Sequence, residues 1–90
     1  MKTFIIDSQF MTSKQSFYRH LDQVFSLPDY FGNNLDALWD VLNEEKEASC
    51  IIFLNSKQAN KNLGAYSERL IDLLKQLAKE NKNYRLYLYE

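Results

Sequence analysis

The pattern of apolar and polar positions divides the chain into strand-like and helix-like stretches. Short runs rich in β-branched or aromatic residues predict three strands, at 3–6 (TFII), 49–54 (SCIIFL) and 84–89 (YRLYLY). The run at 49–54 is continuous rather than alternating, which is typical of a strand covered on both faces. Between the strands, apolar residues recur at helical spacing over about 13–26, 35–42 and 67–79, and each stretch predicts an amphipathic helix.

Each predicted helix has a candidate capping residue at its start. The candidates are Thr12 with Gln15 in a capping box, then Asn33 or Asn34, and finally Ser67. Polar residues 55–65 predict a further short helix or a loop. The order of elements therefore predicts an α/β fold, with a small three-stranded parallel sheet packed against three to four helices. At 90 residues we expect a single domain over 1–90.

Composition excludes several classes of protein. The lone Cys50 excludes an internal disulfide and a cysteine-based metal cluster, and it fits a reducing compartment. His20 has no ligand pattern around it, and we expect it on the surface; no metal or cofactor is predicted. The first residues hold an apolar run of only three, too short for a signal peptide, and nothing approaches the ~18 apolar residues of a membrane span. We expect a cytoplasmic protein.

The net charge of −1 hides a strong asymmetry. Between residues 29 and 47, six acids face one base, Lys46, which gives −5, whereas the rest of the chain has ten bases and six acids, which gives +4. Such a field attracts a cationic partner and repels nucleic acid. On charge alone, a plain solvated helix face remains the alternative.

A helical projection gathers these acids on one side. At about 100° per residue, Asp36, Asp40, Asn43 and Glu44 fall within an arc of about 100°, away from the apolar side chains. Two carboxylates at positions i and i+4 repel each other, so pairing either one with a lysine would serve stability better. A partner that supplies positive charge explains the arrangement. Trp39 lies at the border between the two faces, where core packing and partner contact are both open.

The loop before this helix adds two aromatic residues and a glycine. Tyr30 beside an acidic patch is typical of an interface anchor, whereas Phe31 has core packing as an equal alternative. Gly32 permits a positive φ or the close approach of a partner's backbone.

These residues resemble a known family. Tyr30, Gly32 and the run Asn34–Asp40 (NLDALWD) are similar to the motif of barstar, the intracellular inhibitor of the bacterial ribonuclease barnase. The likeness extends more loosely over the whole chain. It implies a protein that inhibits a secreted ribonuclease at a 1:1 ratio by occlusion and is not an enzyme.

The resemblance also implies roles for individual residues. Asp40 would take the place of an RNA phosphate among the enzyme's basic side chains, Asp36 would pair with a further base, and Tyr30 would pack on the active-site histidine. Further contact positions are Gly32, Asn34, Trp39, Glu44 and Gln76. The sequence departs from the family in two places. Gln76 stands where the family inhibitor has a glutamate, and a second tryptophan just beyond the helix is absent, where this chain has Asn43, Glu44 and Glu45.

Two alternative functions remain from the sequence. One is an immunity or interaction module that uses the same acidic helix on a different nuclease, toxin or basic protein. The other is an enzyme with Asp36 and Asp40 as an acid–base pair. Two exposed carboxylates would both be ionised near neutral pH, so neither could donate a proton, and the chain has no nucleophile motif.

Overall fold

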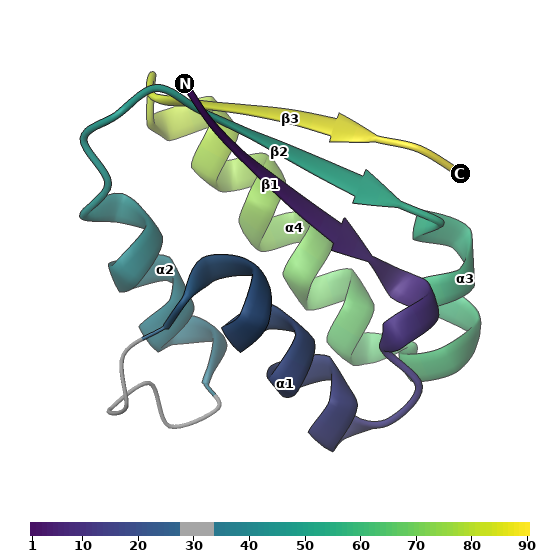
Figure 1. Ribbon diagram of the computed structural model, residues 1–90. Coiled ribbons are helices and arrows are strands. Elements are labelled where there is room, and N and C mark those ends of the chain that lie inside the picture. The colour runs from purple at the N-terminus through teal and green to yellow at the C-terminus, as the bar shows by residue number, and fades with distance from the viewer. Residues whose placement is uncertain (28–33) are drawn as a thin grey trace.

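The chain forms three strands and a set of helices in alternating order (Figure 1). The computed structural model describes residues 1–27 and 34–90, without the side chains of 59, 60 and 62. The elements in order are β1 (Lys2–Asp7), the 3₁₀ turn η1 (Ser8–Phe10), α1 (Lys14–Phe25), α2 (Leu35–Asn43), β2 (Ser49–Leu54), α3 (Ser56–Leu63), α4 (Ala65–Glu80) and β3 (Tyr84–Leu88). The three predicted strands and the main helices are thus confirmed, and the polar stretch 55–65 contains α3.

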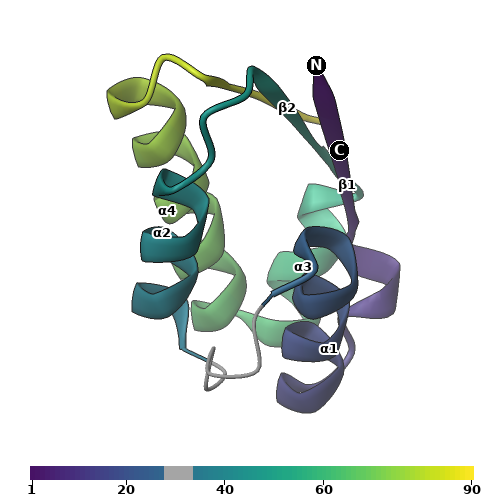
Figure 2. The same cartoon turned by 60° about the vertical axis from the view of Figure 1, so that its left-hand side comes forward.

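The strands form one parallel sheet in the order β1-β2-β3, as predicted. In this register Phe4 lies beside Ile51, which lies beside Leu86. Helices α1, α2 and α4 lie on the same side of the sheet in both ribbon views (Figures 1 and 2). The core fills the space between these two layers. Its fully buried side chains include Ile6, Phe17, Leu21, Leu38, Ile51, Phe53, Leu70, Leu74 and Leu77.

The expectation that residues 49–54 are covered on both faces is wrong. Ser49, Ile51 and Phe53 are buried against the helices, but Cys50, Ile52 and Leu54 are only partly buried. Ile52 lies in register between Ile5 and Tyr87, which are 51% and 43% exposed. The apolar run is continuous because β2 is the central strand, where side chains of two neighbouring strands shield even the open face.

Two predicted helix caps are also wrong. Ser13, not Thr12, caps α1, and Ser16, not Gln15, completes the capping box: the backbone N–H of each serine donates to the hydroxyl oxygen of the other. Helix α4 begins at Ala65 after Gly64, whose φ of 46° lies in the left-handed region that favours glycine. Ser67 is inside the first turn, where its hydroxyl donates to the carbonyl of Gly64.

His20 is buried, which corrects the expectation of a surface histidine. Its Nε2 accepts a hydrogen bond of 2.9 Å from the backbone N–H of Asp7, at the end of β1. Burial lowers the pKa of His20, and the nearby charge of Asp7 only partly opposes this effect. The histidine therefore acts as a neutral acceptor that joins α1 to β1.

Candidate functional site

Helix α2 begins where a side chain satisfies its first free N–H groups. The Oδ1 atom of Asn34 accepts hydrogen bonds from the backbone N–H of Asp36 at 2.7 Å and of Ala37 at 3.4 Å. This choice between the two predicted capping residues follows from geometry, since an Asn oxygen satisfies donors two and three residues ahead. The carboxylate of Asp36 lies in the first turn, where the helix macrodipole stabilises a negative charge.

The two sides of α2 differ in burial. Leu38 and Leu42 are buried, and Leu35 and Trp39 are half-buried against the core. The outward side carries three exposed acids, Asp36, Asp40 and Glu44, which we call the acidic flank. Their spacing of four residues places them along one side of the helix.

The acidic flank works against the stability of its own helix. Each neighbouring pair is a like-charge pair at i and i+4, which destabilises a helix by a few tenths of a kcal/mol. Asp40 and Glu44 also lie at the C-terminal end of α2, where the macrodipole favours cations, and its last turn carries no basic residue. Helix stability therefore does not explain why these acids are there.

The C-terminal end of α2 is fixed to α4 and β3. The buried hydroxyl of Tyr84 donates a hydrogen bond of 2.7 Å to the carbonyl of Leu42. The side-chain amide of Asn81 donates to Oδ1 of Asn43 at 3.1 Å. Burial, with a smaller contribution from the charge of Glu45, raises the pKa of Tyr84 to about 12, so it remains a neutral donor. These bonds hold the helix that carries the acidic flank.

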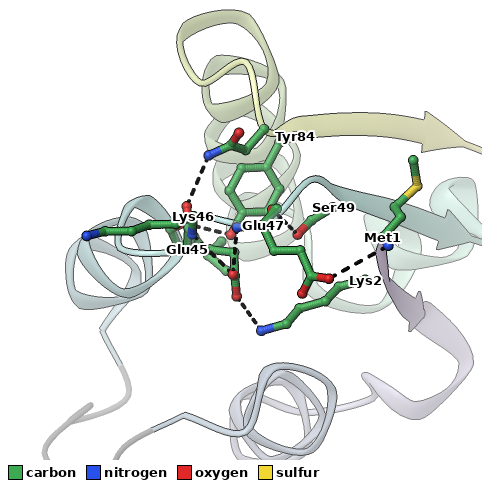
Figure 3. Close-up of polar contacts among 9 residues, drawn as sticks. Met1, Lys2, Glu45, Lys46, Glu47, Ser49 and Tyr84 are labelled. Atoms are coloured by element: carbon green, nitrogen blue, oxygen red, sulfur yellow. Dashed lines mark hydrogen bonds and ion pairs between the residues drawn. The ribbon is translucent and has the colours of Figure 1, made fainter.

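The acids that follow α2 have partners inside the chain. Figure 3 shows the amino-terminal end of β1 beside the connection from α2 to β2. The Nζ atom of Lys2 lies 2.6 Å from a carboxylate oxygen of Glu45, and the terminal amine lies 3.7 Å from Glu47. The hydrogen bond from Lys2 lowers the pKa of Glu45, and so do those from the backbone N–H groups of Glu47 and Lys46.

The acids between residues 36 and 47 therefore fall into two groups. Glu45 and Glu47 form ion pairs with Lys2 and the terminal amine, whereas no ion pair to Asp36, Asp40 or Glu44 occurs among residues 1–27 and 34–90. What remains on the surface of α2 is a charge of −3 from the three exposed acids of the acidic flank.

A groove between α1, α2 and α4 brings three of the expected residues together. It has a volume of about 820 Å³, and Asn34, Asp36 and Gln76 are among its lining residues. Gln76 is thus beside the start of α2, although the two lie on different helices. The sequence did not indicate the other charged residues of this groove, Lys14, Arg69 and Asp72. For the two residues on α4, the available indication was that Arg69, Asp72 and Gln76 recur at helical spacing and so share one side of the helix.

The remaining expected residues are placed as follows. Trp39 and Asp40 lie on α2 and do not line this groove. The backbone carbonyl of Trp39 accepts a hydrogen bond of 3.1 Å from the side chain of Asn43. Tyr30 and Gly32 lie outside the described residues.

The described part of the chain offers neither a metal site nor a membrane-spanning helix. No group of three or more His, Cys, Asp or Glu residues there could hold a metal ion. None of the helices in the same ranges is both long and apolar enough to cross a membrane.

Comparison with known proteins tests the resemblance directly. Residues 1–89 match the barstar family, described as the barnase inhibitor. The chain belongs to the barstar family. A Bacillus subtilis (strain 168) protein, provisionally named ribonuclease inhibitor YrdF, is 30% identical over 84 residues, which cover 92% of each chain.

Membership of the barstar family confirms three expectations. It confirms the resemblance and the α/β fold with its parallel sheet, and it identifies the chain as a ribonuclease inhibitor rather than an enzyme. The enzyme alternative, with Asp36 and Asp40 as an acid–base pair, is therefore set aside.

Proposed function

We propose that the acidic flank of α2, together with the loop before it, enters the cationic active site of a barnase-like ribonuclease and blocks it at a 1:1 ratio. The inhibitor would act inside the cell that makes this enzyme. One observation carries the proposal: Asp36, Asp40 and Glu44 are exposed along one side of a firmly held helix, without an ion pair to any described residue.

The chemistry of the enzyme suits this surface. A ribonuclease must hold RNA phosphates, so its active site is lined with cationic side chains. A carboxylate presents two oxygens to such groups and forms charge-assisted hydrogen bonds with them. Asp40, in the middle of the acidic flank, takes the place of a phosphate, and Asp36 pairs with a further base.

The neighbouring residues have more limited roles. Asn34 already uses its carbonyl oxygen for the helix cap, which leaves its side-chain N–H donors for the enzyme. Trp39, half-buried, offers part of its ring at the border of the surface. Tyr30 and Gly32 keep the contact roles that the family resemblance implies.

A titration of barnase tests this function. Activity on an RNA substrate should fall linearly with added inhibitor and reach its minimum at one equivalent. The association rate should also fall steeply as salt rises, because screening reduces the attraction between the flank and the active site. No inhibition at equimolar concentration, or an association rate indifferent to salt, would contradict the proposal.

One observation favours a second candidate, which is an immunity protein for a different nuclease, toxin or basic protein. The chain carries Gln76 at a position where the family inhibitor has a glutamate, so one ion pair with barnase is absent. Affinity capture from the lysate and culture medium of the producing organism separates the two candidates. A captured protein unrelated to ribonucleases, together with weak inhibition of barnase, would favour the second.

A further inference from the structure

The groove beside the acidic flank has a lining with a clear order. Five of its residues lie on one side of α4, at helical spacing: Tyr66, Arg69, Asp72, Leu73 and Gln76. At 1.5 Å per residue this row is about 15 Å long. Helix α1 contributes Lys14 and Tyr18, and the start of α2 contributes Asn34, Leu35 and Asp36.

One end of the groove is cationic and aromatic. The Nζ atom of Lys14 lies 5.5 Å from the centre of the Tyr66 ring. The rings of Tyr18 and Tyr66 meet edge to face, with centres 6.5 Å apart. Burial raises the pKa of Tyr18, and the charges of Lys14 and Arg69 act in the opposite direction. Lys14 and Arg69 thus line the same end of the groove as the two tyrosines, where α4 begins.

The other end is acidic. Asn43 at the end of α2 is bonded to Asn81 at the end of α4, so the two helices run side by side in the same direction. Counting back from this bond brings Asp36 beside the Gln76 end of the row. Asp72 lies between Arg69 and Gln76. The groove thus changes from positive to negative over about 10 Å.

The cations of the groove have no carboxylate partner among the described residues. The ion pairs recorded there use the terminal amine, Lys2 and Lys57. Arg69 is exposed, and its planar group is well suited to bind a carboxylate through two hydrogen bonds. Two cations beside an acidic binding surface do not strengthen its attraction to a cationic enzyme. Lys14 and Arg69 therefore need another explanation.

We propose that this groove is a second contact region, which receives a segment of the same partner protein. The segment presents a carboxylate to Lys14 and Arg69 and a basic side chain to Asp36 and Asp72. In an extended segment, at about 3.3 Å per residue, these two side chains lie about three residues apart. The proposal rests on the proposed function and adds that the groove selects partners by charges of both signs. A nucleic acid fits less well, because Asp36 and Asp72 repel a polyanion.

Charge reversal in the groove gives a sharp test, since two explanations predict opposite signs. If only the acidic flank attracts the enzyme, then Arg69→Glu makes the inhibitor more negative and leaves binding of barnase unchanged or tighter. If the groove holds a carboxylate, Arg69→Glu and Lys14→Glu each weaken binding at least tenfold. The matched control is Arg85→Glu, an exposed arginine on the open face of the sheet, which changes net charge equally. It should change the dissociation constant less than threefold.

Further measurements distinguish the groove proposal from its alternatives. Thermal melts check that each variant folds. If a charge reversal does not, the matching glutamine variant, Arg69→Gln, Lys14→Gln or Arg85→Gln, replaces it, with a smaller loss expected for the first two. Lysine substitutions of acidic residues around the enzyme's active site should include one that restores binding of Arg69→Glu. If Arg69→Glu binds barnase as tightly as the parent does, while Asp40→Ala binds it more weakly, the groove proposal is wrong and the proposed function stands. No inhibition by the parent chain overturns both. Binding of a 12-nucleotide oligouridylate that Arg69→Glu abolishes would instead assign the groove to RNA.

Discussion

Two parts of one acidic run behave differently in this molecule. On α2, Asp36, Asp40 and Glu44 are exposed and have no ion pair to any described residue. In the connection that directly follows, Glu45 contacts the side chain of Lys2 and Glu47 contacts the terminal amine. Glu45 also accepts hydrogen bonds from the backbone N–H groups of Lys46 and Glu47.

The difference shows how the chain uses its carboxylates. Acids that hold the fold together have cations within reach, and those cations come from a distant part of the sequence. The acids of α2 are arranged against the preferences of their own helix, and no described cation compensates them. Surplus charge that local stability does not explain points to a partner molecule.

The largest expected effect separates the two groups by binding. Asp40→Ala should weaken the complex with barnase by about 2–5 kcal/mol, because the enzyme's cations would remain desolvated and unpaired. That range was established in part on the barnase–barstar complex itself, so it describes a relative of this chain. Glu45→Ala is the matched control and should change binding by less than about 0.5 kcal/mol. Inhibition constants measured for both variants check this, and equal losses would remove the distinction.

The next effect concerns the bond that holds the end of α2. Tyr84→Phe removes the hydroxyl that donates to the carbonyl of Leu42 and should lower the free energy of unfolding by about 1 kcal/mol. Urea denaturation measures the loss. Tyr87→Phe, on the open face of the same strand, is the control and should leave the midpoint unchanged. A similar midpoint for both variants would mean that Tyr84 contributes only its ring.

The sequence predicted the features that depend on neighbouring residues. Periodicity located the strands and the main helices, and the order of elements was sufficient to predict a parallel sheet. The acidic flank also came from spacing alone, because Asp36 and Asp40 lie on α2 and Glu44 follows four residues on, as its C-cap. The capping box of α1 was placed one residue too early, at Thr12 and Gln15, whereas the backbone geometry puts it at Ser13 and Ser16.

Features that depend on distant residues were missed. His20 is buried because the N–H group of Asp7, at the end of β1, requires an acceptor. Glu45 and Lys2 are 43 residues apart in sequence. The groove joins Lys14 of α1 to Arg69 and Asp72 of α4. No spacing rule connects such pairs, since only the packing of the helices on the sheet brings them together.

A smaller effect tests the pair between Lys2 and Glu45 by its pH dependence. The pKa of Glu45 is lowered in the folded chain, so its contribution to stability is present above the ordinary value of 4.5. That contribution is lost as the pH falls through the folded-state pKa, where the carboxylate becomes protonated. The melting temperature of Lys2→Ala should therefore lie below that of the parent near neutral pH, and the gap should close in acid. A gap that persists at low pH would mean that Lys2 acts by packing.

The smallest effect has a sign that distinguishes the acidic flank from an ordinary helix surface. Glu44→Gln removes a like charge four residues from Asp40 and relieves the conflict with the macrodipole, so it should raise the free energy of unfolding by a few tenths of a kcal/mol. Glu68→Gln is the control, because Glu68 lies in the first turn of α4, where a negative charge is favourable. It should lower stability by a similar amount. Paired urea titrations resolve the opposite signs. If Glu44→Gln destabilised the chain, this acid would serve the fold, and its place in the binding surface would lose its support.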